Sequence, residues 1–245
     1  MPARFFVESP LQVGTELDLP PGAARHVQVL RLQPGAKLTL FNGRGGELAA
    51  TVTHMGRSTV RVQVGAQDPV QRELARPVTL ALGMPANERM DTLIEKATEL
   101  GVSAIVPLVC ERSVLRLQGE RAEKKLAHWR GVAVAACEQS GRTQLPLLSA
   151  VTALPTWLQS LPAPGIGARW LLSLDDAPAL AQAAASLAGT IDPVLVLSGP
   201  EGGLSPGEVA LAQDFGFAPV SLGPRVLRAD TAPLAVLAWL GLAHP

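Results

Sequence analysis

Polar and apolar positions follow two different spacings along the chain. In the first part, short runs alternate between apolar and polar residues, as in 59–64, where valines alternate with Arg61 and Gln63. This period of two is typical of strands with one buried face. Runs of this kind are residues 4–7, 17–19, 37–41, 48–54 and 59–64, separated by turns that contain Gly or Pro. One helical stretch, 23–30, lies among them, and the whole predicts a small β-barrel over residues 1–70.

A polar linker, residues 71–77, ends in proline, and strand and helix patterns alternate after it. Continuous apolar runs predict strands at 78–82, 104–109, 170–174, 194–197 and 220–222. Apolar residues at helical spacing predict a helix that ends at Gly101 and further helices at 120–139, 177–187 and 232–242. Strands that alternate with helices form right-handed crossovers, so residues 78–245 are predicted to be an α/β domain with a mostly parallel sheet.

The composition narrows the class of protein without identifying it. With 245 residues, of which 47% are apolar, the chain can bury one large core or two small ones. Basic and acidic residues balance, so only a local patch would attract a nucleic acid. Cys110 and Cys137 lie far apart and without metal-ligand spacing, which favours a reducing cytoplasm over a disulfide framework. No signal peptide or apolar run of about 18 residues is visible, so a soluble cytoplasmic protein is expected.

The segment Ser198-Gly199-Pro200-Glu201-Gly202-Gly203 follows an apolar strand and precedes a capping box, Ser205-Pro206-Gly207-Glu208. Its glycines permit positive φ angles and a close approach of the backbone to a ligand. The segment lacks the lysine of a P-loop and does not match G-x-G-x-x-G, which disfavours a polyphosphate ligand. Glu201 suits a cationic or hydroxyl-bearing ligand better. A tight turn with a solvated glutamate is the alternative interpretation.

A second glycine-containing loop, Leu222-Gly223-Pro224-Arg225-Val226-Leu227-Arg228, follows the last predicted strand. Asp230 or Thr231 after it can cap the closing helix. Capping does not explain two arginines in an apolar loop. Because guanidinium groups bind phosphates and developing oxyanions, Arg225 and Arg228 are candidates for binding an anion.

Two further polar groups are candidates for a site. Glu138-Gln139-Ser140-Gly141-Arg142 ends the long helix, where Gly141 as a C-cap is the simpler interpretation. Arg25, His26 and Arg31 lie on or beside the short helix of the first part, and with Arg44 in a glycine-rich turn they are candidates for a phosphate-contacting patch. For His26 alone, a packed or surface histidine is the simpler interpretation. Arg89, after the linker, belongs either to a solvated helix face or to the same kind of contact.

Taken together, these segments resemble the RsmE family of bacterial small-subunit rRNA uridine-N3 methyltransferases, in the SPOUT superfamily. The resemblance extends from near residue 4 to near residue 240, with its segments in the expected order. The stretches that carry it are Arg25-His26-Val27-Gln28-Val29-Leu30-Arg31, Arg89-Met90-Asp91, Glu95-Lys96-Ala97-Thr98-Glu99-Leu100-Gly101-Val102, Glu111-Arg112-Ser113, Glu138-Gln139-Ser140-Gly141-Arg142 and the two glycine-containing loops. Asp230 departs from the family, which usually has Glu there, and Ala86-Asn87-Glu88 replaces a lysine-bearing stretch.

The resemblance implies a PUA-like, RNA-binding barrel at 1–70 and a SPOUT α/β domain at 78–245 whose C-terminal part threads a trefoil knot. It implies a homodimer that binds S-adenosylmethionine and acts on 16S rRNA of the small ribosomal subunit, without a metal. The residues implied for cofactor binding are Leu197, Ser198, Gly199, Pro200, Glu201, Gly202, Gly203, Leu222, Gly223, Val226 and Leu227. Those implied for RNA binding are Arg25, His26, Arg31 and Arg89.

The chemistry implied is transfer of a methyl group to uracil N3, which carries a proton at neutral pH. Arg228, with Arg225 or Arg142, is the candidate to stabilise negative charge on the uracil oxygens. Glu201 and Glu138 are the candidate proton acceptors. Two alternatives remain open: a SPOUT methyltransferase acting on a ribose 2′-hydroxyl, and a non-catalytic RNA-binding factor in ribosome assembly.

Overall fold

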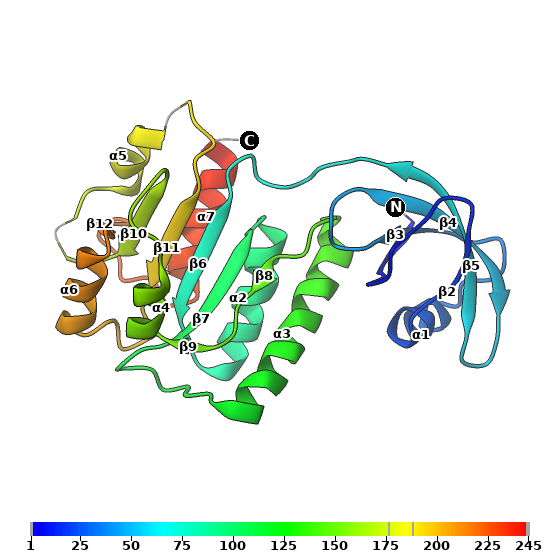
Figure 1. The fold of residues 1–245 in the computed structure, drawn as a ribbon, viewed down its shortest axis with the longest axis horizontal. Coiled ribbons are helices and arrows are strands. Elements are labelled where there is room, and N and C mark those ends of the chain that lie inside the picture. Colours follow the sequence, from blue (N-terminus) through cyan, green and yellow to red (C-terminus); the bar gives the residue numbers. More distant parts are fainter. Residues whose placement is uncertain (1, 176, 188, 244–245) are drawn as a thin grey trace. The chain divides into compact units, whose positions relative to one another are not determined.

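A computed structural model describes residues 2–175, 177–187 and 189–243, which form two compact units. The first unit runs to Glu73 and also takes in Val134–Leu145. The second comprises Leu74–Ala133 and the chain from Pro146 onward. Figure 1 shows the chain coloured by sequence, and each unit is described by itself below.

The first unit contains one five-stranded sheet in the order β1-β3-β4-β5-β2. β1 pairs parallel with β3, and the other pairs are antiparallel. The strands are β1 (Ala3–Phe6), β2 (Glu16–Asp18), β3 (Lys37–Phe41), β4 (Glu47–Met55) and β5 (Val60–Asp68), with helix α1 (Pro21–Val29) between β2 and β3. All five strands and the helix lie where the sequence pattern predicted them, within a few residues.

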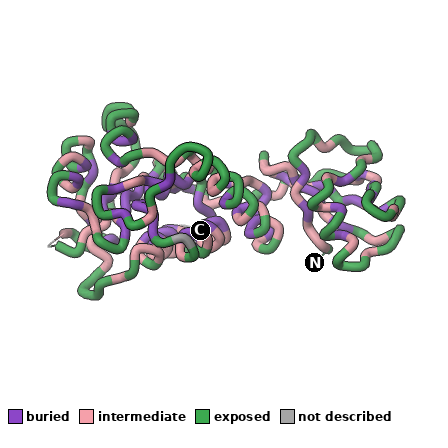
Figure 2. The backbone as a smooth tube through the Cα atoms, turned by 90° about the horizontal axis from the view of Figure 1, so that it is seen from below, coloured by how far each residue is buried: buried purple, intermediate pink, exposed green. Residues whose placement is uncertain are grey.

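Alternation explains which face of this sheet is buried. In β5, Val60, Val62 and Val64 are at most 1% exposed, whereas Arg61 between them is exposed. Their core also receives Phe5 from β1 and Val27 from α1. The tube in Figure 2 shows this interior in purple and the outward residues in green.

The segment Val134–Leu145 joins the first unit through backbone hydrogen bonds. Leu145 N–H donates to the Gly43 carbonyl at 3.2 Å, and Gly45 N–H donates to the Thr143 carbonyl at 3.1 Å. Arg4 Nη2 donates to the carbonyl of Gly141 at 3.1 Å. Sequence spacing alone had grouped these residues with the α/β domain, because contacts between segments about a hundred residues apart leave no periodic signal.

The second unit contains a seven-stranded sheet in the order β12-β10-β11-β6-β7-β8, with β9 also paired to β7. Every strand pair in it is parallel, as predicted from the alternation of strands and helices. The strands are β6 (Val78–Gly83), β7 (Ala104–Val109), β8 (Leu147–Leu148), β9 (Thr152–Ala153), β10 (Ala168–Leu172), β11 (Val194–Ser198) and β12 (Ala218–Val220).

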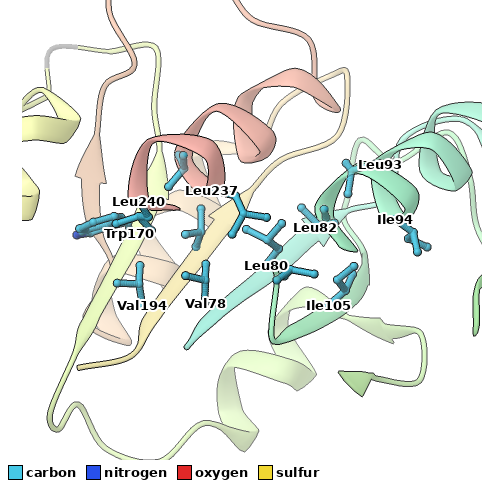
Figure 3. Packing of buried hydrophobic residues seen from close by; sticks show 14 of the residues in the cluster. Val78, Leu80, Leu82, Leu93, Ile94, Ile105, Trp170, Val194, Leu237 and Leu240 are labelled. Carbon is cyan, nitrogen blue, oxygen red and sulfur yellow. The ribbon is translucent and has the colours of Figure 1, made fainter. Parts of the chain in front are cut away.

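Helices cover both faces of this sheet, and the side chains of its strands alternate between two cores. In β6, Val78, Leu80 and Leu82 belong to one core and Ala81 to the other. Figure 3 shows the first core, where Leu237 and Leu240 of the last helix and Leu93 of an earlier helix pack on the strands. The helices are α2 (Asn87–Glu99), α3 (Gly119–Ser140), α4 (Leu154–Ser160), α5 (Leu180–Ala184) with η1 (Ala185–Leu187), α6 (Pro206–Asp214) and α7 (Thr231–Ala243). The part of α3 from Val134 onward belongs to the first unit.

Four expectations about elements need correction. The helix predicted at 177–187 begins at Leu180 and ends in the 3₁₀ turn η1. The last strand, β12, spans Ala218–Val220 instead of 220–222. β12 contains Pro219, which lacks an N–H group. The sheet tolerates this proline because β12 is an edge strand. β10 likewise ends at Leu172 and not at residue 174. The short elements β8, β9 and α4 were not predicted, because runs of two to seven residues are too short to show a period.

Over the described part of the chain, no helix combines the length and apolar character that crossing a membrane requires.

Candidate active site

A cavity of about 630 Å³ lies in the second unit, at the carboxyl ends of β10, β11 and β12. Open α/β sheets place their ligands at this edge, where the loops after the strands diverge. Three loops supply most of the wall: residues 173–175 after β10, 199–204 after β11, and 222–229 after β12. The volume is in the range of small-molecule sites, roughly 300–1,000 Å³.

The loop after β11 requires glycine where it contacts its surroundings. A Cβ on Gly199 would lie 3.0 Å from the backbone nitrogen of Leu204, and Gly203 has a φ of 68°. The constraint extends to the neighbouring strand, since a Cβ on Gly83 at the end of β6 would lie 2.4 Å from Pro200 Cδ. The backbone of this loop is therefore packed tightly against its protein neighbours on one side and lines the cavity on the other.

A buried capping box fixes where the loop ends and α6 begins. Ser205 Oγ accepts from the Glu208 N–H at 3.3 Å, and Glu208 Oε2 accepts from the Ser205 N–H at 2.9 Å. Glu208 Oε1 accepts in addition from the Glu111 N–H at 2.8 Å. Glu208 is only 7% exposed, and these N–H groups at the start of the helix replace the water that its carboxylate loses on burial.

The side chain of Arg112 also fixes this loop, through hydrogen bonds to its backbone. Its Nη1 donates to the carbonyl of Gly202 at 3.2 Å and to that of Leu204 at 3.4 Å. A Cβ on Gly202 would lie 3.0 Å from the Cβ of Arg112, so the two backbones need glycine to come this close. The sequence placed Arg112 in the family resemblance but gave it no role, because nothing local indicates a contact about ninety residues away.

Glu201 is the polar side chain of the loop and is held at the start of α2. Its Oε1 accepts from the Ala86 N–H at 3.1 Å and lies 3.6 Å from Nη1 of Arg89. Arg89 also lines the cavity. The glutamate predicted for a cationic ligand thus has protein partners already.

The loop after β12 exposes two arginines at the cavity. Arg225 and Arg228 both line it and both are exposed, and Val226 between them is 79% exposed. The backbone of Arg228 is fixed, because its carbonyl accepts from the N–H groups of Thr231 at 2.9 Å and Ala232 at 3.0 Å and so starts α7. The guanidinium group of Arg228 therefore extends from an anchored backbone position.

The third wall, Leu171 to Asp175, was not predicted as part of the site. Ser173 N–H donates to the Val220 carbonyl at 3.0 Å, which joins this loop to the end of β12. The available signal was topological: a parallel strand next to β11 brings its carboxyl end to the same edge.

The residues predicted for cofactor binding lie together, with one difference. Ser198, Leu222, Gly223, Leu227 and the residues of the glycine loop line the cavity. Leu197 points away from it, since its side chain is fully buried in the core beneath α4 and α6. Leu197 can therefore contact a cofactor only through its backbone.

Glu138 and Arg142 lie in the first unit, whereas the cavity is lined by residues of the second. Glu138 Oε1 accepts from the Phe6 N–H at 2.9 Å, and burial raises the pKa of this carboxyl above its usual value. Arg142 is 3% exposed and its Nε donates to Glu73 Oε2 at 3.0 Å. Both side chains therefore have partners within the first unit.

Arg25, His26 and Arg31 also lie in the first unit, on or just after α1, and all three are exposed. His26 packs its ring edge-on against Phe5, with centroids 5.3 Å apart, and its Nδ1 lies 3.8 Å from Glu138 Oε2. Arg31 has a φ of 54°, a left-handed conformation that ends the helix. The fourth residue predicted for RNA binding, Arg89, belongs to the cavity of the second unit.

Cys110 lies behind the glycine loop but is not a nucleophile. Burial raises the pKa of its thiol to about 12, and the charge of Glu208 adds to the effect. The thiol is therefore protonated at neutral pH and reacts weakly.

Family models match both parts of the chain. Residues 72–241 match an RNA methyltransferase domain, and residues 19–65 match an RNA methyltransferase PUA domain. The fold and the cavity are thus those of an RNA methyltransferase with a PUA-like N-terminal domain.

Individual relatives narrow the class. The chain is 34% identical to the ribosomal RNA small subunit methyltransferase E of Synechocystis, over 87% of this chain and 68% of the relative. The Mycobacterium bovis protein of that name is also 34% identical, over 87% of this chain and 81% of the relative. This chain belongs to the ribosomal RNA small subunit methyltransferase E family.

Solved structures agree over nearly the whole chain. The Neisseria gonorrhoeae ribosomal RNA small subunit methyltransferase E, bound to S-adenosyl methionine, has a TM-score of 0.90 at 32% identity and covers 99% of this chain and 98% of its own. A Legionella pneumophila protein in complex with the cofactor SAM has a TM-score of 0.91 at 33% identity, with the same coverage.

Proposed function

We propose that this protein transfers the methyl group of S-adenosylmethionine to N3 of a uridine in 16S rRNA. The observation that carries the proposal is the cavity at the carboxyl ends of β10, β11 and β12, walled by two glycine-containing loops and faced by Arg225 and Arg228. Family membership and the two relatives solved with S-adenosylmethionine support it. The specificity for N3 rests on the family resemblance.

The residues of the cavity fit this cofactor. Apolar side chains, among them Leu172, Leu204 and Val209, offer packing for a flat purine ring. The carboxylate of Asp175 at the wall complements a ligand with positively charged sulfonium and amino groups. The loop backbones supply the N–H and C=O groups that a ribose and an adenine edge require.

Bound S-adenosylmethionine supplies a methyl group that its sulfonium centre has already activated. The work left to the protein is to place uracil N3 in line with that group and to assist the loss of the N3 proton. As the proton leaves, negative charge spreads over the uracil oxygens. Arg228, with Arg225 beside it, stabilises this charge from its anchored position at the start of α7.

Arg142 and Glu138 take a different place in the proposal. Both are engaged inside the first unit, Arg142 with Glu73 and Glu138 with the Phe6 N–H. We therefore assign charge stabilisation to Arg228 and Arg225. Of the two candidates for proton acceptor, Glu201 lines the cavity, whereas Glu138 belongs to the first unit.

The proposal assigns different roles to the two parts of the chain. Residues 1–70, with Arg25, His26 and Arg31 exposed around α1, bind RNA, and residues 78–245 hold the cofactor and carry out the transfer. The polar stretch 71–77 joins them. The segment around the two glycine-containing loops threads a trefoil knot, and the protein acts as a homodimer in the cytoplasm.

The test combines cofactor binding with product analysis. Calorimetry with S-adenosylmethionine should show one specific site per chain, and incubation with small ribosomal subunits should label rRNA as 3-methyluridine. A 2′-O-methylnucleoside product would instead indicate a ribose methyltransferase. A protein that binds RNA but shows no specific heat with S-adenosylmethionine would be a non-catalytic factor.

A further inference from the structure

Helix α2 begins without a cap of its own. Its N-cap residue is Ala86, which has no side-chain acceptor, and its third residue is Arg89 where a capping box has Glu or Gln. Helix α6 shows the complete arrangement, with Ser205 at the N-cap and Glu208 at the third position. In α2 both halves of the box are missing from the local sequence.

Glu201 supplies one of these halves from a distance of 115 residues in sequence. Its Oε1 accepts from the N–H of Ala86, which is the donor that a glutamate at the third helical position would satisfy. The same oxygen lies 3.6 Å from Nη1 of Arg89. A carboxylate at this place also interacts favourably with the positive end of the helix dipole.

Glu201 is well suited to tie the two elements together. In the loop Gly199-Pro200-Glu201-Gly202-Gly203 it is the one residue with a polar side chain. The rest of the loop is held through its backbone, by Arg112 on the carbonyl of Gly202 and by close packing of Pro200 on Gly83. Without Glu201, the side of the loop that faces α2 would lose its hydrogen bond to that helix.

We propose that Glu201 is a positioning residue: the hydrogen bond by which it caps α2 also ties the cofactor-binding loop to the start of that helix, and this tie fixes the loop and Arg89 at the cavity. This inference rests on the proposed function and deepens it, because it assigns Glu201 a role other than accepting the uracil N3 proton. Oε1 of this carboxylate accepts a hydrogen bond at a helix N-terminus and faces an arginine, and these contacts hold the side chain in one orientation.

Three variants separate capping from positioning and from proton transfer. Glu201→Ala removes the acceptor, and Glu201→Gln keeps an acceptor but removes the charge and the basicity. Ala86→Asp with Glu201→Ala gives α2 the other half of the box, an N-cap side chain that accepts from the N–H groups of the first turn. Ala86 is exposed, so aspartate fits there without repacking. Glu120→Ala, which removes an exposed ion pair with Lys124, is the matched control.

Positioning predicts a distinct result for each variant. Glu201→Ala lowers Tm by about 2–4 °C, as expected for a lost cap in a chain of this size. It also weakens S-adenosylmethionine binding roughly tenfold, because the loop is no longer preorganised. Glu201→Gln lowers kcat by less than about tenfold, whereas loss of a general base costs roughly 10²–10⁴. The double variant regains the Tm but not the cofactor affinity, and the control changes neither.

Two results would overturn the inference. One is a loss of kcat in Glu201→Gln by about 100-fold or more with unchanged cofactor affinity, which identifies a proton acceptor. The other is recovery of cofactor affinity in the double variant, which reduces Glu201 to a helix cap. Failure of the proposed function would look different: wild-type protein would make no 3-methyluridine, while the Tm and affinity comparisons would still judge the role of Glu201.

Discussion

Arg228 is the residue on which the proposed chemistry depends most. Its carbonyl starts α7 through hydrogen bonds from Thr231 and Ala232, and its guanidinium is exposed at the cavity. Substitution leaves the backbone contacts intact, so the effect is confined to the side chain. This combination makes it a better probe of catalysis than Arg142, which is buried against Glu73.

Arg228→Ala should lower the methylation rate by roughly 10²–10³, the cost of removing one donor that stabilises developing negative charge. Affinity for S-adenosylmethionine should stay nearly the same, because Gly223, Val226 and Leu227 keep the loop wall. Single-turnover kinetics and calorimetry measure the two quantities. Arg121→Ala, on the exposed face of α3, is the control, and equal losses of rate and cofactor affinity in Arg228→Ala would contradict the assignment.

Gly83 is important because it has no Cβ atom. A Cβ there would lie 2.4 Å from Pro200 Cδ and 2.6 Å from Pro200 N. Gly83→Ala should therefore displace the glycine loop, destabilise the protein by about 1–3 kcal/mol as overpacking does, and weaken cofactor binding. Denaturant titration and calorimetry would detect both, and a stable variant with normal cofactor affinity would show that the loop has room to move.

Glu138 predicts a pH dependence of stability. Burial raises the pKa of its carboxyl above the ordinary value of 4.5, so the folded state binds the proton more tightly than the unfolded state does. Ionisation of Glu138 therefore costs stability as the pH rises from 4.5 through the raised value, and the cost is constant above it. Stability from this group is fully present only below the unfolded pKa.

Glu138→Gln removes that ionisation and keeps an oxygen that accepts the Phe6 N–H. Relative to wild type, the variant should gain stability as the pH rises above 4.5, the ordinary pKa of this carboxyl. Urea unfolding at several pH values measures the difference. A difference that is independent of pH, or one that favours wild type more strongly at pH 7, would contradict the explanation.

Among the secondary-structure elements, the starts of α6 and α2 show how the site is held. α6 carries its capping box in its own sequence, and the sequence predicted it. The start of α2 depends on Glu201 from another loop, and no local pattern could indicate that. Local signals thus predict elements, whereas contacts between distant segments decide how the site is assembled.

Ser205→Ala tests the local box. Loss of the Ser205 acceptor should destabilise the protein by about 0.5–2 kcal/mol, which lowers the Tm by a few degrees. Glu208 should keep its bond to the Glu111 N–H, so the glycine loop keeps one attachment. Thermal unfolding measures the loss, and a variant with unchanged stability would show that the hydrogen bond to Ser205 contributes nothing.

The fold was predictable from the sequence to a large extent, and the site in part. Alternation in β5 and continuous apolar runs in β6 and β11 report burial directly, so these strands were placed correctly. The third cavity wall and the roles of Arg112 and Glu201 depend on contacts between segments far apart in sequence. Pro219 in β12 obscured a strand that only its edge position permits.

At the scale of the whole molecule, the chain is not divided at a single point. The segment Val134–Leu145, which follows strands and helices of the second unit, completes the first unit through Glu138, Gly141 and Leu145. Family membership extends over both units, since the RNA methyltransferase model covers 72–241 and the PUA model 19–65. The proposed function accordingly needs the full chain, with RNA binding in one unit and methyl transfer in the other.

The most direct test is nucleoside mass spectrometry of 16S rRNA after incubation of small ribosomal subunits with the full-length protein and isotope-labelled S-adenosylmethionine. Subunits from a strain that lacks its own enzyme of this family provide the unmethylated substrate. The proposed function predicts label in 3-methyluridine, and Arg228→Ala should reduce it roughly 10²–10³-fold. Label in a 2′-O-methylnucleoside, or no labelled nucleoside although the protein binds the cofactor, would contradict it.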